Sequence, residues 1–295
     1  MSIFQKLIFS TLILTTLNAF GAQSTTATAQ TDSKATAKLW DQLNDKKLQL
    51  KSKSVLIVDE FNQPIYEKSS DDVLPIASIT KLMSAMVVID AQLPLNEKIT
   101  IIKEDRDLIQ LTGSRLKYGA SLTRAEMIKL ALMSSENRAA TALGRTYPGG
   151  LVSFIKAMNE KALSLGMKNS HFADPAGLNT DNTSSARDLA ILVQAALLYP
   201  LIHEATTQKE ITVYPYKRKG PLRYVNTNRL MRNKRWDIAL SKTGYINEAG
   251  RCLVMQTEII GQPLTIILLN SFGKLTPFGD ANRIRKWIEG GLKKS

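Results

Sequence analysis

A serine and a lysine one helical turn apart mark the start of an apolar segment, and these residue types can carry out acyl transfer. Ser78 and Lys81 follow Pro75 and lead into the apolar residues 82–88. On a helix, residues three apart lie on the same face. A neutral lysine amine can take the proton of a serine hydroxyl and make it a nucleophile. The pattern is common by chance, and alone it favours an N-cap serine with a solvated lysine.

Two further motifs support a catalytic role for Ser78 and Lys81. Ser135 and Asn137 lie in a polar break between two helical segments. Lys242, Thr243 and Gly244 lie in a strand-like segment. The three motifs in this order, at a helix start, an inter-helix loop and a strand, are typical of serine acyl-transferases with a lysine base. Taken singly, Ser135 and Asn137 could cap the following helix, and Lys242 could be solvated.

The elements that must position these motifs follow a simple order. Apolar strand-like segments occur near both ends of the chain, and helical patterns fill the middle, one of them opened by a capping box at Thr123 and Glu126. The expected strands are 55–58, 65–67, 211–214, 236–245, 253–260 and 264–269, and the expected helices are 78–93, 123–133, 138–144, 151–165, 185–198 and 280–294. This order predicts one sheet covered by helices, with an all-helical lobe inserted.

The closing helix has an apolar face formed by Ile284, Trp287, Ile288 and Leu292. This face predicts packing on the sheet. Because the opposite face is basic, a helix lying on a membrane surface is the alternative.

The first 38 residues have the pattern of a targeting region. Lys6 precedes the apolar residues 7–17, and the small residues at 19–22 suit cleavage, which predicts a signal peptide at 1–22. The apolar run is too short for a convincing membrane span. Residues 23–38 are rich in Thr, Ala, Ser and Gln and are expected to form a flexible leader. The sequence therefore predicts a folded domain at 39–295, exported to the periplasm without an integral membrane anchor.

Composition narrows the function classes. The formal net charge is +13, which could suit nucleic acid, anionic lipid or an acidic wall polymer. Only residues 217–219 form a basic cluster and no nucleic-acid motif accompanies it, so no nucleic-acid partner is expected. Cys252 is the single cysteine, which excludes an internal disulfide. His171 and His203 are the only histidines, too few for most zinc sites, and we expect neither a metal nor a cofactor.

The three motifs resemble those of the penicillin-recognising serine enzymes, which are the penicillin-binding proteins and the class A and C β-lactamases. Residues 174–178 and 182–190 are similar to a signature of the low-molecular-mass D-alanyl-D-alanine carboxypeptidase/endopeptidase family. The resemblance covers about residues 53–287. It implies a β-lactamase/transpeptidase-like fold of the α+β or α/β class, with an antiparallel sheet flanked by helices and an inserted all-helical lobe.

The resemblance implies three catalytic residues. Ser78 would attack the carbonyl and carry the acyl ester. Lys81 would accept its proton, for which its pKa must fall through burial, the adjacent helix start and the like charge of Lys242. Ser135 would relay a proton towards the leaving amine.

Five residues are implied to bind the substrate. Asn137 would bond the substrate backbone, and Lys242 and Thr243 would hold its carboxylate. Gly244 would let the strand approach closely, because a side chain there would block the acyl donor. The backbone N–H groups of Ser78 and Tyr245 would form the oxyanion hole.

Several functions fit these motifs. The favoured one is a penicillin-sensitive DD-peptidase that cuts D-alanyl bonds of peptidoglycan, and the alternatives are a β-lactamase or a non-catalytic penicillin-binding sensor. A class A β-lactamase takes a glutamate base from the loop that corresponds to 174–188, which here contains no glutamate, although Asp174, Asp181 and Asp188 are present. A sensor would carry a membrane span and a signalling domain, and neither is visible in the sequence.

The length of the sequence after the third motif favours cleavage of a cross-link over removal of a terminal D-alanine. Carboxypeptidases of this family continue into a separate β-rich domain and a membrane-anchoring tail, whereas residues 246–295 offer room for two strands and one helix. The compact form resembles the D-alanyl-D-alanine endopeptidases, which cleave cross-links, and a carboxypeptidase is the alternative. The expected partners are peptidoglycan peptides and, as covalent inhibitors, β-lactams, with the protein acting as a monomer. We expect the loops at 113–119 and 226–236 to decide which bond is cut.

Overall fold

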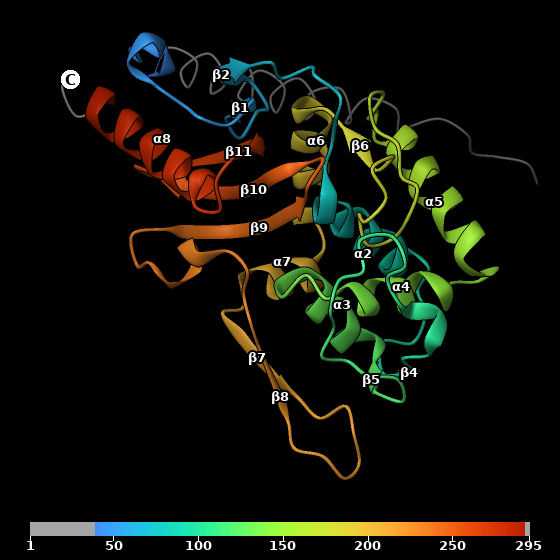
Figure 1. Cartoon of the computed structure of the whole chain (residues 1–295). Coiled ribbons are helices and arrows are strands. Elements are labelled where there is room, and N and C mark those ends of the chain that lie inside the picture. Colours follow the sequence, from blue (N-terminus) through green and yellow to red (C-terminus); the bar gives the residue numbers. More distant parts are fainter. Residues whose placement is uncertain (1–38, 293–295) are drawn as a thin grey trace, which may run out of the picture. The chain divides into compact units, whose positions relative to one another are not determined.

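The computed structural model describes residues 39–292 (Figure 1). Its contacts divide the chain into two compact units, Met1–Gln42 and Leu43–Ser295, which are considered separately. The predicted signal peptide and leader lie outside the described residues. The predicted domain start near Leu39 likewise stays a prediction. The fold below is that of the second unit.

An antiparallel sheet of five strands forms the centre of this unit, in the order β2-β1-β11-β10-β9 (Figure 1). Its strands are β1 (Ser54–Val58), β2 (Pro64–Lys68), β9 (Asp237–Ile246), β10 (Gly250–Ile259) and β11 (Gln262–Ser271). The pairing of Ser54 with Leu269 joins the beginning of the unit to its end. All five residues of β1 are buried, as expected for a strand covered on both faces. The strand β9 is an edge strand, so one side of its backbone can pair with another chain.

Helices surround the sheet and form a separate lobe, which confirms the predicted fold class. They are α2 (Lys81–Asp90), α3 (Arg124–Met133), α4 (Asn137–Arg145), α5 (Gly150–Ser164), α6 (Ala186–Leu197), α7 (Pro200–Thr207) and α8 (Thr276–Leu292). The capping box at the start of α3 is present, with Thr123 and Glu126 each accepting from the backbone N–H of the other. The helix α7 is not among the predicted elements; it begins at Pro200, and proline is well tolerated in the first turn of a helix.

Short elements complete the unit. They are β3 (Leu74–Pro75) with β6 (Thr183–Ser184), β4 (Lys98–Thr100) with β5 (Ser121–Thr123), β7 (Glu210–Val213) with β8 (Leu222–Val225), and four 3-10 helices, η1 (Asp45–Lys47), η2 (Ala77–Thr80), η3 (Lys103–Asp105) and η4 (Arg229–Arg232). The helix expected at 78–93 is therefore two elements, since η2 precedes α2. The β7–β8 hairpin carries the basic residues 217–219 at its tip and projects from the body (Figure 1).

The closing helix α8 packs on β10 and β11, as its apolar face predicts. Ile284 and Ile288 are completely buried, while Trp287 packs edge-on against Tyr66 of β2. The carboxylate of Asp280 fixes the helix to the segment before β1, because it accepts bonds from the backbone N–H groups at 51 and 52. Within residues 39–292, no single helix is long and apolar enough to span a membrane. The described pair α6 and α7 meets the length and composition of a span only when the two helices are taken together, and they are bent by 106° relative to each other.

Candidate active site

Ser78 lies in η2, directly before α2, and η2 packs against the edge strand β9. The approach is close at Gly244, where an added Cβ would lie 2.9 Å from the carbonyl oxygen of Ile76 and 3.1 Å from the nitrogen of Ser78. Glycine is therefore required because β9 touches the backbone that carries the serine. This reason differs from the expected one, which was space for the acyl donor. The contact fixes Ser78 beside the Lys-Thr-Gly strand.

Lys81, the first residue of α2, is completely buried beside Ser78. Its Nζ lies 2.8 Å from the Oγ of Ser78, 2.7 Å from the Oδ1 of Asn137 and 2.6 Å from the carbonyl oxygen of Ala176. Two of these three neighbours are carbonyl-type oxygens, which can only accept hydrogen bonds. The hydroxyl of Ser78 is therefore the single neighbour from which the amine can take a proton.

Burial lowers the pKa of Lys81 from its ordinary value to about 7. The negative charges of Asp174, Glu136 and Asp107 act in the opposite direction and raise it. The main cause agrees with the prediction, whereas the charge of Lys242 is not among the causes at Lys81. A pKa near 7 leaves a substantial fraction of the amine neutral at neutral pH.

Ser135 and Asn137 meet this pair from the loop between α3 and α4. Ser135 has a φ of 59°, in the left-handed region, and its Oγ accepts a bond from the Nζ of Lys242 at 3.0 Å. The N-cap of α4 is Glu136, so neither Ser135 nor Asn137 caps that helix. The Nδ2 of Asn137 donates to the Oγ1 of Thr112 at 2.8 Å, which holds its oxygen towards Lys81.

Lys242 is almost fully buried on β9, and burial together with the positive charge of Lys81 lowers its pKa well below the ordinary value. The charge of one lysine therefore lowers the pKa of Lys242, and not that of Lys81 as expected. Its Nζ also donates to the carbonyl oxygen of Thr243 at 2.8 Å. The hydroxyl of Thr243 donates to the Oγ1 of Thr227 at 2.7 Å, which ties β9 to the loop before η4.

The loop after α5 supplies backbone groups to which the sequence analysis gave no role. Asp174 accepts from the backbone N–H groups at 176, 177, 178 and 179 and from the side chain of Asn182. This bonding places the carbonyl of Ala176 on the amine of Lys81. The run 174–178, which is similar to a family signature, was the one sequence feature that pointed to this loop. It could not show that the main-chain atoms of the loop face Lys81.

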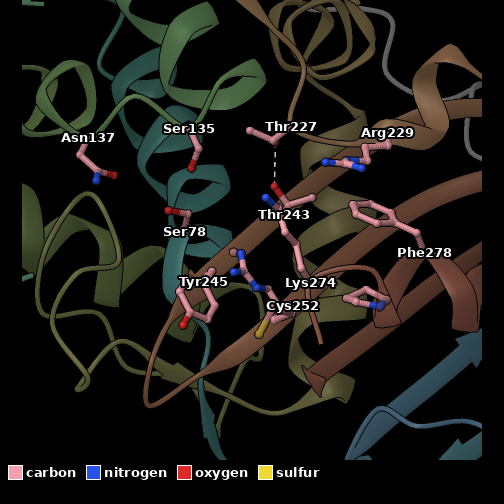
Figure 2. Close-up of a pocket in the computed structure, with 13 residues that line it drawn as sticks. Ser78, Ser135, Asn137, Thr227, Arg229, Thr243, Tyr245, Cys252, Lys274 and Phe278 are labelled. Carbon is pink, nitrogen blue, oxygen red and sulfur yellow. Dashed lines mark hydrogen bonds between the residues drawn. The ribbon is translucent and has the colours of Figure 1, made fainter. Parts of the chain in front are cut away.

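A cavity of about 350 Å³ opens beside these groups (Figure 2). Among the predicted site residues, it is lined by Ser78, Ser135, Asn137, Thr243, Gly244 and Tyr245. Lys81 and Lys242 are buried behind the wall rather than on it. The cavity continues past Thr243 to residues outside the predicted set of site residues, and these are Thr227, Arg229, Arg251, Cys252, Lys274, Pro277 and Phe278. Within residues 39–292, no group of three or more His, Cys, Asp or Glu residues is placed to hold a metal.

Comparison with known proteins gives concordant matches. The family model described as D-alanyl-D-alanine carboxypeptidase matches residues 41–273. The chain is 47% identical to a D-alanyl-D-alanine endopeptidase of Pseudomonas aeruginosa over 244 residues, which is 82% of this chain and 79% of the relative. An enzyme of the same name from Escherichia coli gives the same identity and coverage.

Solved structures share the fold. The DD-transpeptidase of Streptomyces K15 superposes with a TM-score of 0.75 at 26% identity, covering 82% of this chain and 98% of that one. Penicillin-binding protein D2 of Listeria monocytogenes, solved in its cefotaxime-bound form, gives a TM-score of 0.71 at 27% identity, with the same coverage.

Proposed function

The chain belongs to the D-alanyl-D-alanine carboxypeptidase family of serine peptidases, and we propose that it is an endopeptidase that cleaves D-alanyl cross-links of peptidoglycan. The nucleophile in this proposal is Ser78 and the general base is Lys81. The observation that carries the choice of bond is the extension of the cavity past Thr243, because a cross-link continues beyond the carboxylate next to the scissile bond.

Acylation begins with the proton of Ser78. A neutral Lys81 has two N–H groups and one lone pair. The carbonyl of Ala176 and the Oδ1 of Asn137 take the two N–H groups, so the lone pair faces the serine at 2.8 Å. The proton passes to the amine as the serine oxygen bonds to the substrate carbonyl carbon.

Collapse of the tetrahedral intermediate breaks the carbon–nitrogen bond, and the leaving nitrogen must gain a proton. That proton is the one that Lys81 took from Ser78, and the hydroxyl of Ser135 relays it while accepting a bond from the Nζ of Lys242 at 3.0 Å, so that Lys81 becomes neutral again. The backbone N–H groups of Ser78 and Tyr245 hold the oxyanion. Ser78 lies in η2 and Tyr245 in β9, and these two elements pack against each other. Water then hydrolyses the ester on Ser78.

The substrate carboxylate binds at Thr243, which lines the cavity, with Lys242 buried directly behind it. A carboxylate at this position favours the charged form of Lys242, which opposes the lowering of its pKa in the empty site. Asn137 has both ends of its amide engaged within the protein, and the second N–H of its Nδ2 can donate to the substrate backbone while the bond to Thr112 is kept.

Relatives support cleavage of a cross-link over removal of a terminal D-alanine. The two relatives at 47% identity are named D-alanyl-D-alanine endopeptidase, whereas a relative named D-alanyl-D-alanine carboxypeptidase from Bacillus subtilis is 31% identical. Within the cavity, Thr227 and Arg229 come from the loop 226–236, which the sequence analysis expected to shape this region. Export to the periplasm and covalent inhibition by β-lactams are part of the same proposal.

Two carboxylates of the loop 174–188 are poorly suited to a β-lactamase. The carboxylate of Asp174 is occupied by backbone and amide N–H groups, and that of Asp188 accepts from the backbone N–H of Asn169 and the hydroxyl of Ser170. A carboxylate that activates water must be able to accept the proton of that water. The third, Asp181, is exposed at the end of the loop.

Digestion of purified wall fragments tests the proposal. Cross-linked muropeptide dimers and uncross-linked pentapeptides are incubated separately with the protein, and the products are identified by mass spectrometry. We expect dimers to be split to monomers faster than pentapeptides lose D-alanine, and Ser78→Ala to do neither. Rapid trimming of pentapeptides with intact dimers would reject the endopeptidase assignment while keeping the serine mechanism.

A further inference from the structure

Three basic side chains line the part of the cavity that lies beyond Thr243. Arg229 comes from η4, Arg251 from β10 and Lys274 from the segment before α8, so three separate elements converge there. In Figure 2, Arg229 and Phe278 lie on the opposite side of Thr243 from Ser135. The lining contains no Asp or Glu. This part of the cavity is therefore positively charged.

These charges are not neutralised within the described chain. None of the three side chains forms a hydrogen bond or an ion pair with another residue in 39–292, although Arg251 stacks on the ring of Tyr245 at 3.5 Å. By contrast, other arginines of the described chain are paired, such as Arg145 with Asp105. Unpaired cations that converge on one cavity favour an anionic ligand.

The leaving half of a cross-link has the matching chemistry. A terminal D-alanine leaves with a single carboxylate, which Thr243 and Lys242 already account for. A cross-link instead releases a whole peptide attached through a diamino acid, and that peptide carries further carboxylates. The methylene chain of the diamino acid would run over Pro277 and Phe278, the apolar part of the same wall.

We propose that Arg229, Arg251 and Lys274 form a subsite that binds the additional carboxylates of the leaving peptide. This inference rests on the proposed endopeptidase function and names the residues that recognise its substrate. The subsite lies at the cavity rim, because Arg229 and Lys274 are exposed. Each contact is therefore expected to be weak and sensitive to salt, and selectivity to arise from the sum of the three.

Binding of the leaving peptide tests the subsite without cutting a bond. Two acceptor tetrapeptides containing a diamino acid are compared by calorimetry, one with free carboxylates and one with every carboxylate amidated except the one next to the amine that forms the cross-link. For the free peptide we expect Arg229→Gln and Lys274→Gln each to weaken binding about 2- to 5-fold, and the double variant about 10-fold. The amidated peptide is expected to bind wild type more weakly and to be insensitive to both substitutions.

Lys234→Gln is the matched control, because Lys234 is an exposed cation of the same loop outside the cavity lining. It removes the same charge and should leave the affinity of the free peptide unchanged. An equal loss in Lys234→Gln, or no preference for the free peptide, would overturn the subsite. The dimer digestion is run on the same wild-type preparation. Intact dimers together with charge-dependent peptide binding would reject the endopeptidase function but leave the subsite as an acidic-peptide site.

Discussion

The backbone of Gly177 packs against the carbonyl of Ala77, the residue before the proposed nucleophile. A Cβ at Gly177 would lie 1.9 Å from the carbonyl oxygen of Ala77 and 2.9 Å from the nitrogen of Ser78. Both residues have left-handed backbone, with φ of 75° at Gly177 and 47° at Ala77. The loop that bonds Lys81 is thus also a support for the strained turn that presents the serine.

Gly177→Ala should therefore lose both stability and acylation. The left-handed conformation costs alanine about 1 kcal/mol, and the collision with a backbone atom adds to that cost. Gly166→Ala is the control, because Gly166 has a φ of 80° and open space around its Cβ. We expect the thermal midpoint of Gly177→Ala to lie well below that of Gly166→Ala, with slower penicillin acylation. Equal midpoints in the two variants would show that the contact is not tight.

The pH dependence of acylation should follow the titration of Lys81. Only the neutral amine accepts a proton, so the rate should rise with pH and reach half of its plateau near pH 7. Lys81→Arg keeps a positive charge but does not deprotonate, and it should lose acylation by several orders of magnitude. Stopped-flow acylation by a chromogenic cephalosporin between pH 5 and 9 measures both. Near wild-type acylation in Lys81→Arg would place the base elsewhere.

The same lowered pKa predicts how stability changes with pH. Between about pH 7 and pH 10, the unfolded chain keeps a proton on Lys81 that the folded protein has released. Because the unfolded state binds more protons there, stability contributed by this group rises with pH, at up to about 1.4 kcal/mol per unit. Lys81→Met should remove this rise. The test compares urea unfolding of wild type and variant at pH 7 and pH 9, and a constant difference in the free energy of unfolding would contradict it.

Asp174 should act as a positioning residue for Lys81. Its two oxygens accept four backbone N–H groups and one amide, so an asparagine would turn an NH₂ group towards donors. Asp174→Asn should displace the carbonyl of Ala176, lower stability by about 2 kcal/mol and shift the acid limb of the acylation profile. Asp181→Asn, on the exposed end of the same loop, is the control. A stability loss with an unchanged pH profile would reduce Asp174 to a structural role.

The sequence predicted the sheet, most helices and the three motifs because each leaves a local pattern. Val-rich and Ile-rich runs indicate buried strands, and Thr123 with Glu126 indicates a helix start through contacts only three residues apart. The contacts that complete the site are of another kind. Ala176 acts through its main-chain oxygen, and Arg229 and Lys274 converge only after the chain has folded. Main-chain groups and tertiary convergence leave no periodic signal in one sequence.

The last prediction concerns the ester that a penicillin forms with Ser78. Penicillin should label Ser78 and no other residue, so Ser78→Ala should abolish labelling while leaving the thermal midpoint close to that of wild type. The ester should also persist, because a class A β-lactamase hydrolyses its penicilloyl ester with a water that a free carboxylate activates. In the loop 174–188, both oxygens of Asp174 and the Oδ2 of Asp188 accept bonds from N–H and hydroxyl donors of the protein. The ester formed with a natural peptide is hydrolysed faster, in part because its leaving group departs and opens the site to water. The opened lactam instead stays tethered to the acyl group. Intact-mass spectrometry should therefore show one penicilloyl adduct per chain, with bound drug and no steady release of hydrolysed penicillin over many minutes. A burst of adduct followed by continuous turnover would instead assign the site to a β-lactamase.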